Sequence, residues 1–211
     1  MESNKERGQF ALMQVNILVE GITDEPVAKK LLAYAGLEFG QTYGRKGKPY
    51  VLERAPIYNK AAKFAPWFVL VDLDSDIHCP SEALALWLPD PTDGMRFRVA
   101  VRAIEAWLMA ERESIADFLG VSLSRIPNRI DQISNPKQTL VNIARMSHSR
   151  SIQEDIVPRQ GSGVSVGPLY VRRLIEYTEK YWRPGEGEKN SESLCRCIKA
   201  LSTLVVSPVC Y

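Results

Sequence analysis

The sequence has few residues of the kinds that bind soft metals or form disulfides. It holds four cysteines and two histidines in 211 residues. Cys195 and Cys197 are separated by one residue, which is too short a spacing for a zinc site. No apolar run approaches the ~20 residues of a membrane span, and the charged start MESNKERGQF does not resemble a signal peptide. We therefore expect reduced thiols in a cytoplasmic protein that has no membrane partner.

The chain also has little net charge, because 27 Lys and Arg are set against 25 Asp and Glu. This balance excludes the wholesale charge neutralisation that histones use, but it permits a local basic groove. With 45% hydrophobic and 25% charged residues, the composition is that of a globular protein. The length predicts one domain, or one domain with a helical appendage.

Strand and helix signals alternate over the first 120 residues. Apolar or alternating runs predict strands at 15–19, 37–43, 67–71 and 95–102. Helical spacing fits the segments between them, at 24–35, 50–64 and 80–88, with a break near Pro56. Two further helices are expected at 103–111 and 113–119. The pattern predicts an α/β fold, Rossmann-like, with a mostly parallel sheet flanked by helices.

Strand signals stop after Gly120. Helices are expected at 136–146, 168–182 and 191–204, while the Ser-, Gln- and Gly-rich segment 147–167 predicts a mobile loop. A second break is expected at 184–187. The predicted organisation is an α/β core over residues 1–120 and a helical C-terminal extension over 121–211, packed on the core as one compact unit.

Two acidic clusters follow the two strongest strands. Glu20 ends the first, and Asp72, Asp74 and Asp76 follow the second. Ligands of open parallel sheets bind outside the carboxyl ends of the strands, so these acids are expected to meet there. Their mutual repulsion would be relieved by a divalent cation, and hard oxygen ligands favour Mg²⁺ or Mn²⁺. Asp76 is counted as a metal ligand, although a turn or helix cap explains it equally well.

Phosphate binding is predicted for residues near these acids. Gly21 would let the backbone approach a phosphate beside a helix N-terminus. The loop containing Arg45, Lys46 and Lys48 is flanked by glycines that would let it wrap phosphates; a solvated surface loop is the alternative.

A further pair of charged residues lies just beyond the fourth predicted strand. Arg102 is predicted to bind substrate, and Glu105 follows it by three residues. Glu105 is either an additional acidic residue of the site or the ion-pair partner of Arg102.

The motif Val-Glu20-Gly-x-x-Asp24, followed by Asp72-x-Asp74, resembles the Toprim domain of topoisomerases, bacterial primases and OLD-type nucleases. The string RVAVRAIEAWLMA at 98–110 is similar to a Toprim-like family of unknown function. That family also carries a Gly-Lys loop and a later Asn-Pro-Lys, which match 47–48 and 135–137 here. The resemblance implies that Glu20 is a general acid/base or metal ligand and that the aspartates bind metal. Glu111 stands where the family often has aspartate.

The resemblance implies phosphodiester chemistry. Our leading hypothesis is a Mg²⁺-dependent nuclease acting on DNA or RNA, with water as the nucleophile. A partner ATPase and a role in phage defence or DNA repair are implied by the resemblance alone, and a homodimer is left open. The alternative is a catalytically inactive Toprim-fold module that binds nucleotide, nucleic acid or a protein partner. A nucleotide-sugar transferase also uses Asp-x-Asp with Mn²⁺, but the upstream Glu-Gly and the short chain argue against it.

Overall fold

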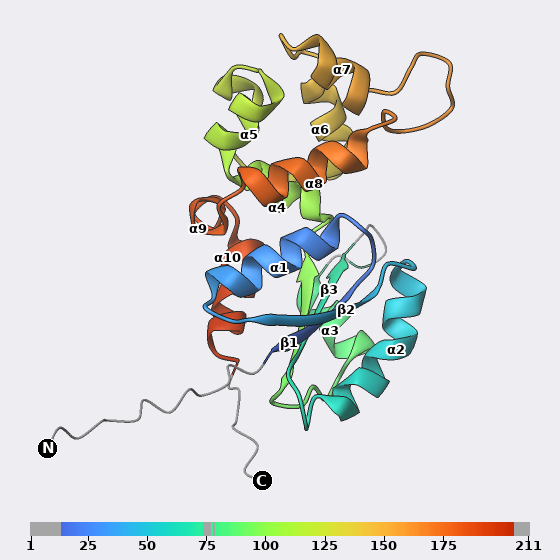
Figure 1. The fold of residues 1–211 in the computed structure, drawn as a ribbon, viewed down its shortest axis with the longest axis vertical. Coiled ribbons are helices and arrows are strands. Elements are labelled where there is room, and N and C mark those ends of the chain that lie inside the picture. Colours follow the sequence, from blue (N-terminus) through green and yellow to red (C-terminus); the bar gives the residue numbers. More distant parts are fainter. Residues whose placement is uncertain (1–13, 74–76, 78, 205–211) are drawn as a thin grey trace, which may run out of the picture.

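A four-stranded, all-parallel sheet forms the centre of the protein (Figure 1). The computed structural model describes residues 14–73, 77 and 79–204. The strand order is β2-β1-β3-β4, with bounds β1 Val15–Val19, β2 Phe39–Gly44, β3 Trp67–Asp72 and β4 Met95–Ala100. The two continuous apolar runs, β1 and β3, take the central positions because both of their faces are covered. The chain is an α/β protein.

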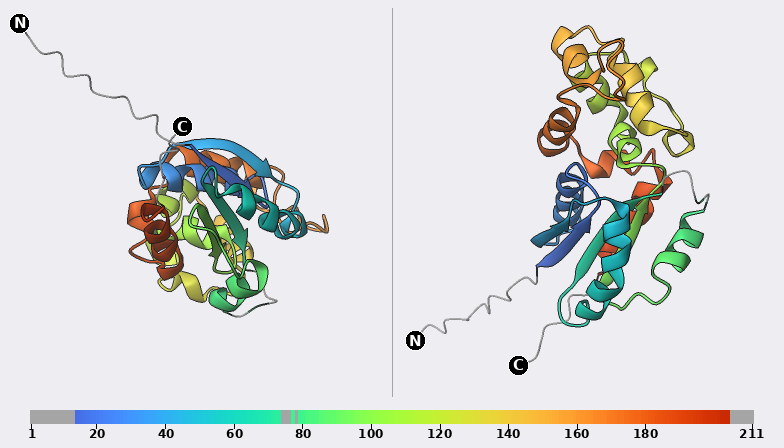
Figure 2. Two further views of the ribbon diagram at one scale, coloured as in Figure 1. Left: turned by 90° about the horizontal axis from the view of Figure 1, so that it is seen from below. Right: turned by 90° about the vertical axis from the view of Figure 1, so that its right-hand side faces the viewer.

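Helices cover both faces of the sheet, which gives three layers (Figure 2). α1 (Asp24–Tyr34) and α10 (Glu192–Ser202) pack on one face, and α2 (Lys48–Ala61) and α3 (Pro80–Trp87) pack on the other. The side chains of β1 divide accordingly: Ile17 and Val19 join the apolar cluster of the α1 face, and Leu18 joins that of the α2 face. This alternation is what an extended strand between two helical layers requires.

The remaining helices gather beyond the carboxyl ends of the strands, and we call them the helical lobe (Figure 2). They are α4 Ile104–Ala110, α5 Arg112–Leu119, α6 Pro136–Ala144, α7 Arg150–Ile156, α8 Tyr170–Lys180 and α9 Pro184–Gly187, with 3₁₀ turns at Leu123–Arg125 and Ile130–Gln132. α8 packs against α1, and one apolar cluster runs from the sheet into the lobe. No helix in the described part of the chain is long and apolar enough to cross a membrane.

Three local expectations were wrong. α2 continues through Pro56, which lies exposed on the solvent side of the helix, so the backbone hydrogen bond that proline removes is replaced by water. The predicted loop 147–167 contains α7, whose Ile152 and Ile156 are buried. The break at 184–187 is a short helix, α9.

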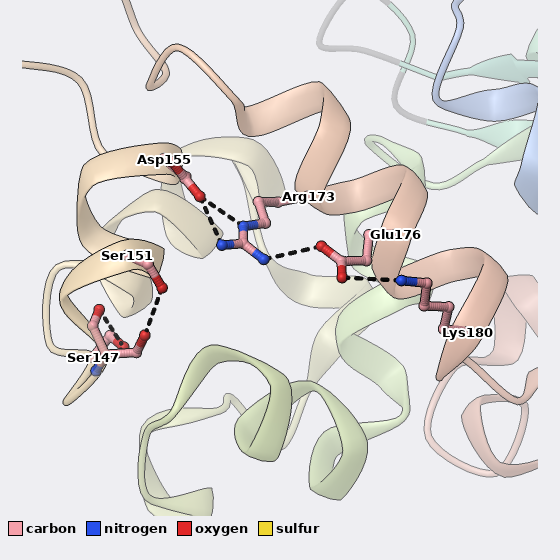
Figure 3. A network of polar contacts seen from close by, with 7 residues as sticks. Ser147, Ser151, Asp155, Arg173, Glu176 and Lys180 are labelled. Atoms are coloured by element: carbon pink, nitrogen blue, oxygen red, sulfur yellow. Dashed lines mark hydrogen bonds and ion pairs between the residues drawn. The ribbon is translucent and has the colours of Figure 1, made fainter.

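An arginine of α8 helps to order α7. Arg173 donates from Nε to Asp155 Oδ2 over 2.8 Å and from Nη1 to Glu176 Oε2 over 2.9 Å (Figure 3). This ion-pair network and the two buried isoleucines explain why a polar, serine-rich segment forms a packed helix.

Candidate functional site

The strand order reverses between β1 and β3. After β1 the chain passes through α1 to β2 on one side, and after β3 it passes through α3 to β4 on the other. The loops that leave β1 and β3 therefore diverge, and such a switch point is where open parallel sheets bind ligands. Glu20 follows β1 directly and Asp72 is the last residue of β3, so both acids stand at this point.

The structure brings these two acids together. Glu20 Oε2 accepts a hydrogen bond from the Asp72 backbone N–H over 2.7 Å, across 52 residues of sequence. Asp72 Oδ1 in turn accepts from the N–H of Ile104, the first residue of α4, over 3.0 Å. A carboxylate has about four lone-pair sites, so each group can accept from more than one donor. The result is two half-buried carboxylates fixed by the backbone at the edge of the sheet.

A third acid, Asp24, lies beside them in the first turn of α1. It is buried, with 5% of its surface exposed, and its carboxylate accepts hydrogen bonds from Gly21 N–H (2.8 Å) and Thr23 Oγ1 (3.3 Å). Burial raises the pKa of Asp24, and the negative charge of Glu105 raises it further. The Gly21 N–H is thus used within this turn, and the approach of a phosphate to the Gly21 backbone stays a prediction.

Glu105 is the most enclosed of the acids at this edge. Its side chain, in the first turn of α4, is 3% exposed and accepts a hydrogen bond from the Tyr170 hydroxyl over 2.9 Å. Lys137 Nζ lies 3.8 Å from the same oxygen. Burial, Glu105 and Asp72 together raise the pKa of Tyr170 far above its ordinary value, so the hydroxyl keeps its proton and donates. Glu105 therefore links α6 and α8 to the acidic edge.

Two loops at the same edge have strained backbones. Arg102, between β4 and α4, has φ 68°, and Arg45, after β2, has φ 62°. A left-handed conformation costs a non-glycine residue roughly 1–2 kcal/mol, and such strain collects at functional sites. In the described residues these are the only non-glycine positions with positive φ.

The basic loop, residues 45–48, lies next to Glu20, but its basic side chains already make contacts with other residues. The Gly47 N–H donates to the Glu20 carbonyl over 2.9 Å, which ties the loop to the site. Arg45 Nη1 pairs with Glu25 Oε2 at 2.8 Å. Lys46 and Lys48 lie 5.0 Å and 5.3 Å from the ring centroids of Tyr50 and Trp87. The loop thus approaches the site through its backbone, with Arg45 held in an ion pair.

Two of the predicted metal ligands, Asp74 and Asp76, lie outside the described residues. Across 14–73, 77 and 79–204, no three His, Cys, Asp or Glu side chains are grouped so that they could hold a metal ion. The predicted metal centre thus stays a prediction. It rests on Glu20 and Asp72, which the structure joins, and on the two aspartates beyond them.

Sequence reasoning missed the buried second tier of the site. Asp24 and Lys137 are named from the sequence only through the family resemblance, and Tyr170 is not predicted to be part of the site. The position of Asp24 four residues after Glu20 was the available signal, because the first turn of α1 must return to the strand end. Nothing in the sequence pairs Tyr170 with Glu105, 65 residues away.

Comparison with protein-family models, with curated proteins and with solved structures finds no match to this chain.

Proposed function

We propose that this protein is a Mg²⁺-dependent nuclease of the Toprim type that acts on nucleic-acid phosphodiester bonds. One observation carries the proposal: Glu20 and Asp72, 52 residues apart, are hydrogen-bonded at the switch point of a parallel sheet. An acid with its charge placed at the end of a buried apolar strand is costly unless it has a task there.

The roles follow from position. Asp72, with Asp74 and Asp76, would hold the metal, whose charge would stabilise the oxygen that leaves the phosphorus. Glu20 would take the proton of the attacking water or return one to the leaving oxygen. Its hydrogen bond with the Asp72 N–H holds Glu20 beside the backbone of Asp72. The second tier, the buried acids Asp24 and Glu105, adds negative charge behind Glu20 and Asp72.

The charge distribution suggests where the substrate would lie. Residues 121–204 carry 13 Lys and Arg against 8 Asp and Glu, whereas residues 14–120 carry 12 against 15. The basic part includes most of the helical lobe, which stands over the acidic edge (Figure 1). A polyanion would therefore be held by the lobe and presented to the carboxylates. A partner ATPase, with phage defence or DNA repair as the setting, rests on the family resemblance alone.

A metal-dependent cleavage assay tests the proposal. Supercoiled plasmid, single-stranded DNA and RNA would be incubated with the protein in Mg²⁺, in Mn²⁺ and in chelator. Glu20→Gln and Asp72→Asn should each reduce cleavage at least about 100-fold. Glu53→Gln, an exposed acid on α2, is the matched control and should leave the rate unchanged. Cleavage that persists in both site variants would refute the mechanism.

A non-catalytic Toprim-fold module is the second candidate. The observation in its favour is that both acids already have a structural role: Asp72 accepts the first N–H of α4, and Glu20 accepts the N–H of the last residue of β3. Thermal unfolding with and without Mg²⁺ separates the two functions. Metal at 100 times its dissociation constant should stabilise the fold by ~2.7 kcal/mol, or roughly 5–10 °C for a chain of this size. No shift at millimolar Mg²⁺ would favour the module.

A further inference from the structure

A cavity of about 320 Å³ lies at the open edge of β4, between α3 and α10. Its lining includes Ser81 and Leu84 of α3, Arg98 of β4, and Ser193 and Cys197 of α10. The volume lies at the lower end of the range typical of small-molecule sites. Of the described acids of the candidate nuclease site, neither Glu20 nor Asp72 lines it.

The Nε–H of Arg98, a half-buried residue, has no hydrogen-bond acceptor among the described residues that line this cavity. Its Nε is buried, and within the described part of the chain no hydrogen-bond acceptor contacts it. A buried donor without an acceptor is unfavourable, because the lost hydration is not replaced.

Other arginines of the protein show how the fold normally satisfies this group. Arg96, two residues earlier on the same strand face, donates to the carbonyls of Ala200 and Thr203 over 2.9 and 2.8 Å and so caps α10. Arg173, which lines a larger cavity in the helical lobe, is bonded to two carboxylates (Figure 3).

Within the described residues, Arg54 and Arg112 also have a buried Nε without an acceptor, but Arg54 pairs with Glu53 and Arg112 donates from Nη2 to the Ile126 carbonyl. Among these three arginines, Arg98 alone lines this cavity.

The other polar groups of the cavity do not supply the missing anion. Asp131 accepts from Ser191 Oγ (2.7 Å) and from the Ser193 N–H (3.1 Å), which uses its carboxylate to begin α10. Glu192 is bonded to Arg196 on the same helix. Burial raises the pKa of Cys197 to about 12, so its thiol is neutral at physiological pH.

We propose that this cavity binds a small ligand through an oxyanion, a phosphate or a carboxylate, that pairs with Arg98. Leu84, Val99 and Val101 line the cavity beside the arginine and would contact a compact apolar part of the ligand. Arginine suits this task because its planar fork offers two parallel donors to an oxyanion. The site makes no use of Glu20 or Asp72, so oxyanion binding can be tested apart from their role in cleavage.

The test uses inorganic phosphate and acetate as probes on the full chain. Each is titrated at constant ionic strength, with chloride as the balancing anion, while the arginine Nε–H signals are followed by ¹⁵N NMR. The Arg98 signal, assigned by its loss in Arg98→Met, should shift saturably with one of the two oxyanions. Calorimetry should show that Arg98→Met binds that oxyanion about 10- to 100-fold more weakly. Arg172→Met, which removes an exposed arginine of α8, should bind it as the parent does.

Each outcome bears on the proposal. A response to phosphate alone identifies a phosphorylated ligand, and a response to acetate alone identifies a carboxylate. Equal affinity in the Arg98→Met and parent proteins, or no saturable shift at tens of millimolar of either anion, would overturn it. Because Glu20→Gln leaves the cavity unchanged, its oxyanion affinity should equal that of the parent even where cleavage is lost.

Discussion

Tyr170→Phe should destabilise the protein through one hydrogen bond. The Tyr170 hydroxyl donates to Glu105 over 2.9 Å in a buried setting, and phenylalanine keeps the ring contacts while removing the donor. A hydrogen bond to a charged group contributes about 1.5–3 kcal/mol, which corresponds to a fall in Tm of roughly 3–12 °C for a chain of this length. Urea unfolding followed by circular dichroism gives the free energy directly.

The control for this change lies on the same helix. Tyr177 is also buried, but its hydroxyl reaches the neutral carbonyl of Leu108 at 3.4 Å, so Tyr177→Phe should cost less, about 0.5–1.5 kcal/mol. A double-mutant cycle with Glu105→Gln then isolates the charged interaction, because phenylalanine at position 170 should cost about 1 kcal/mol less when the carboxylate is absent. Equal costs on both backgrounds, or a Tyr170→Phe cost no larger than that of Tyr177→Phe, would refute the assignment of Glu105 as a buried anion held by this hydroxyl.

Three further predictions concern residues elsewhere in the fold. The pKa of Asp24 is raised in the folded protein, so its contribution to stability is complete below the ordinary pKa of 3.8 and is lost as pH rises through the higher folded pKa. Asp24→Asn should therefore gain stability relative to the parent as pH rises across this range. Urea unfolding of both proteins from pH 3 to 7 tests this, and a constant difference between their unfolding free energies would contradict it. Cys79 is exposed and a hydrogen bond with Ser81 lowers its pKa, whereas burial raises the pKa of Cys197 to about 12. In the native protein, mass spectrometry should therefore find Cys79 alkylated far faster than Cys197. Comparable rates for the two thiols would show that α10 is not packed as described. Gly44 has φ 94°, and an added Cβ would lie 2.1 Å from the Val19 carbonyl oxygen. Gly44→Ala should therefore lower the unfolding free energy by about 2 kcal/mol or more. Gly36 has open space around it, so Gly36→Ala should cost only its backbone strain.

The strands were predictable because each carries its own signal. β1 and β3 are continuous apolar runs and β4 alternates, so periodicity alone located them, and the parallel sheet followed from the helices between them. The errors arose where tertiary contacts override local preference. Pro56 is tolerated because that side of α2 faces water, and α7 depends on Asp155 and Arg173, which a local window cannot relate.

The candidate site was predictable only in its first tier. Glu20 and Asp72 follow strong strands, so the general geometry of parallel sheets placed them together without knowledge of side-chain contacts. Glu105 was left between two roles because its contacts with Tyr170 and Lys137 come from α8 and α6. Those helices lie 65 and 32 residues further along the chain, and their approach depends on how the helical lobe packs.

The contacts of Glu105 make the acidic edge depend on α6 and α8. A carboxylate that is 3% exposed is tolerated only with its donor and cation in place, and here the hydroxyl comes from α8 and the ammonium from α6. Asp24 lies close enough for the Glu105 charge to raise its pKa, and Asp72 holds the first N–H of the helix that carries Glu105. Displacing α6 and α8 from α4 would leave Glu105 without its donors and disturb the acids of both tiers. It follows that a chain truncated after residue 120 should lose more than the extension: the core that remains would keep Glu20 and Asp72 in sequence but lack the partners that hold this edge together.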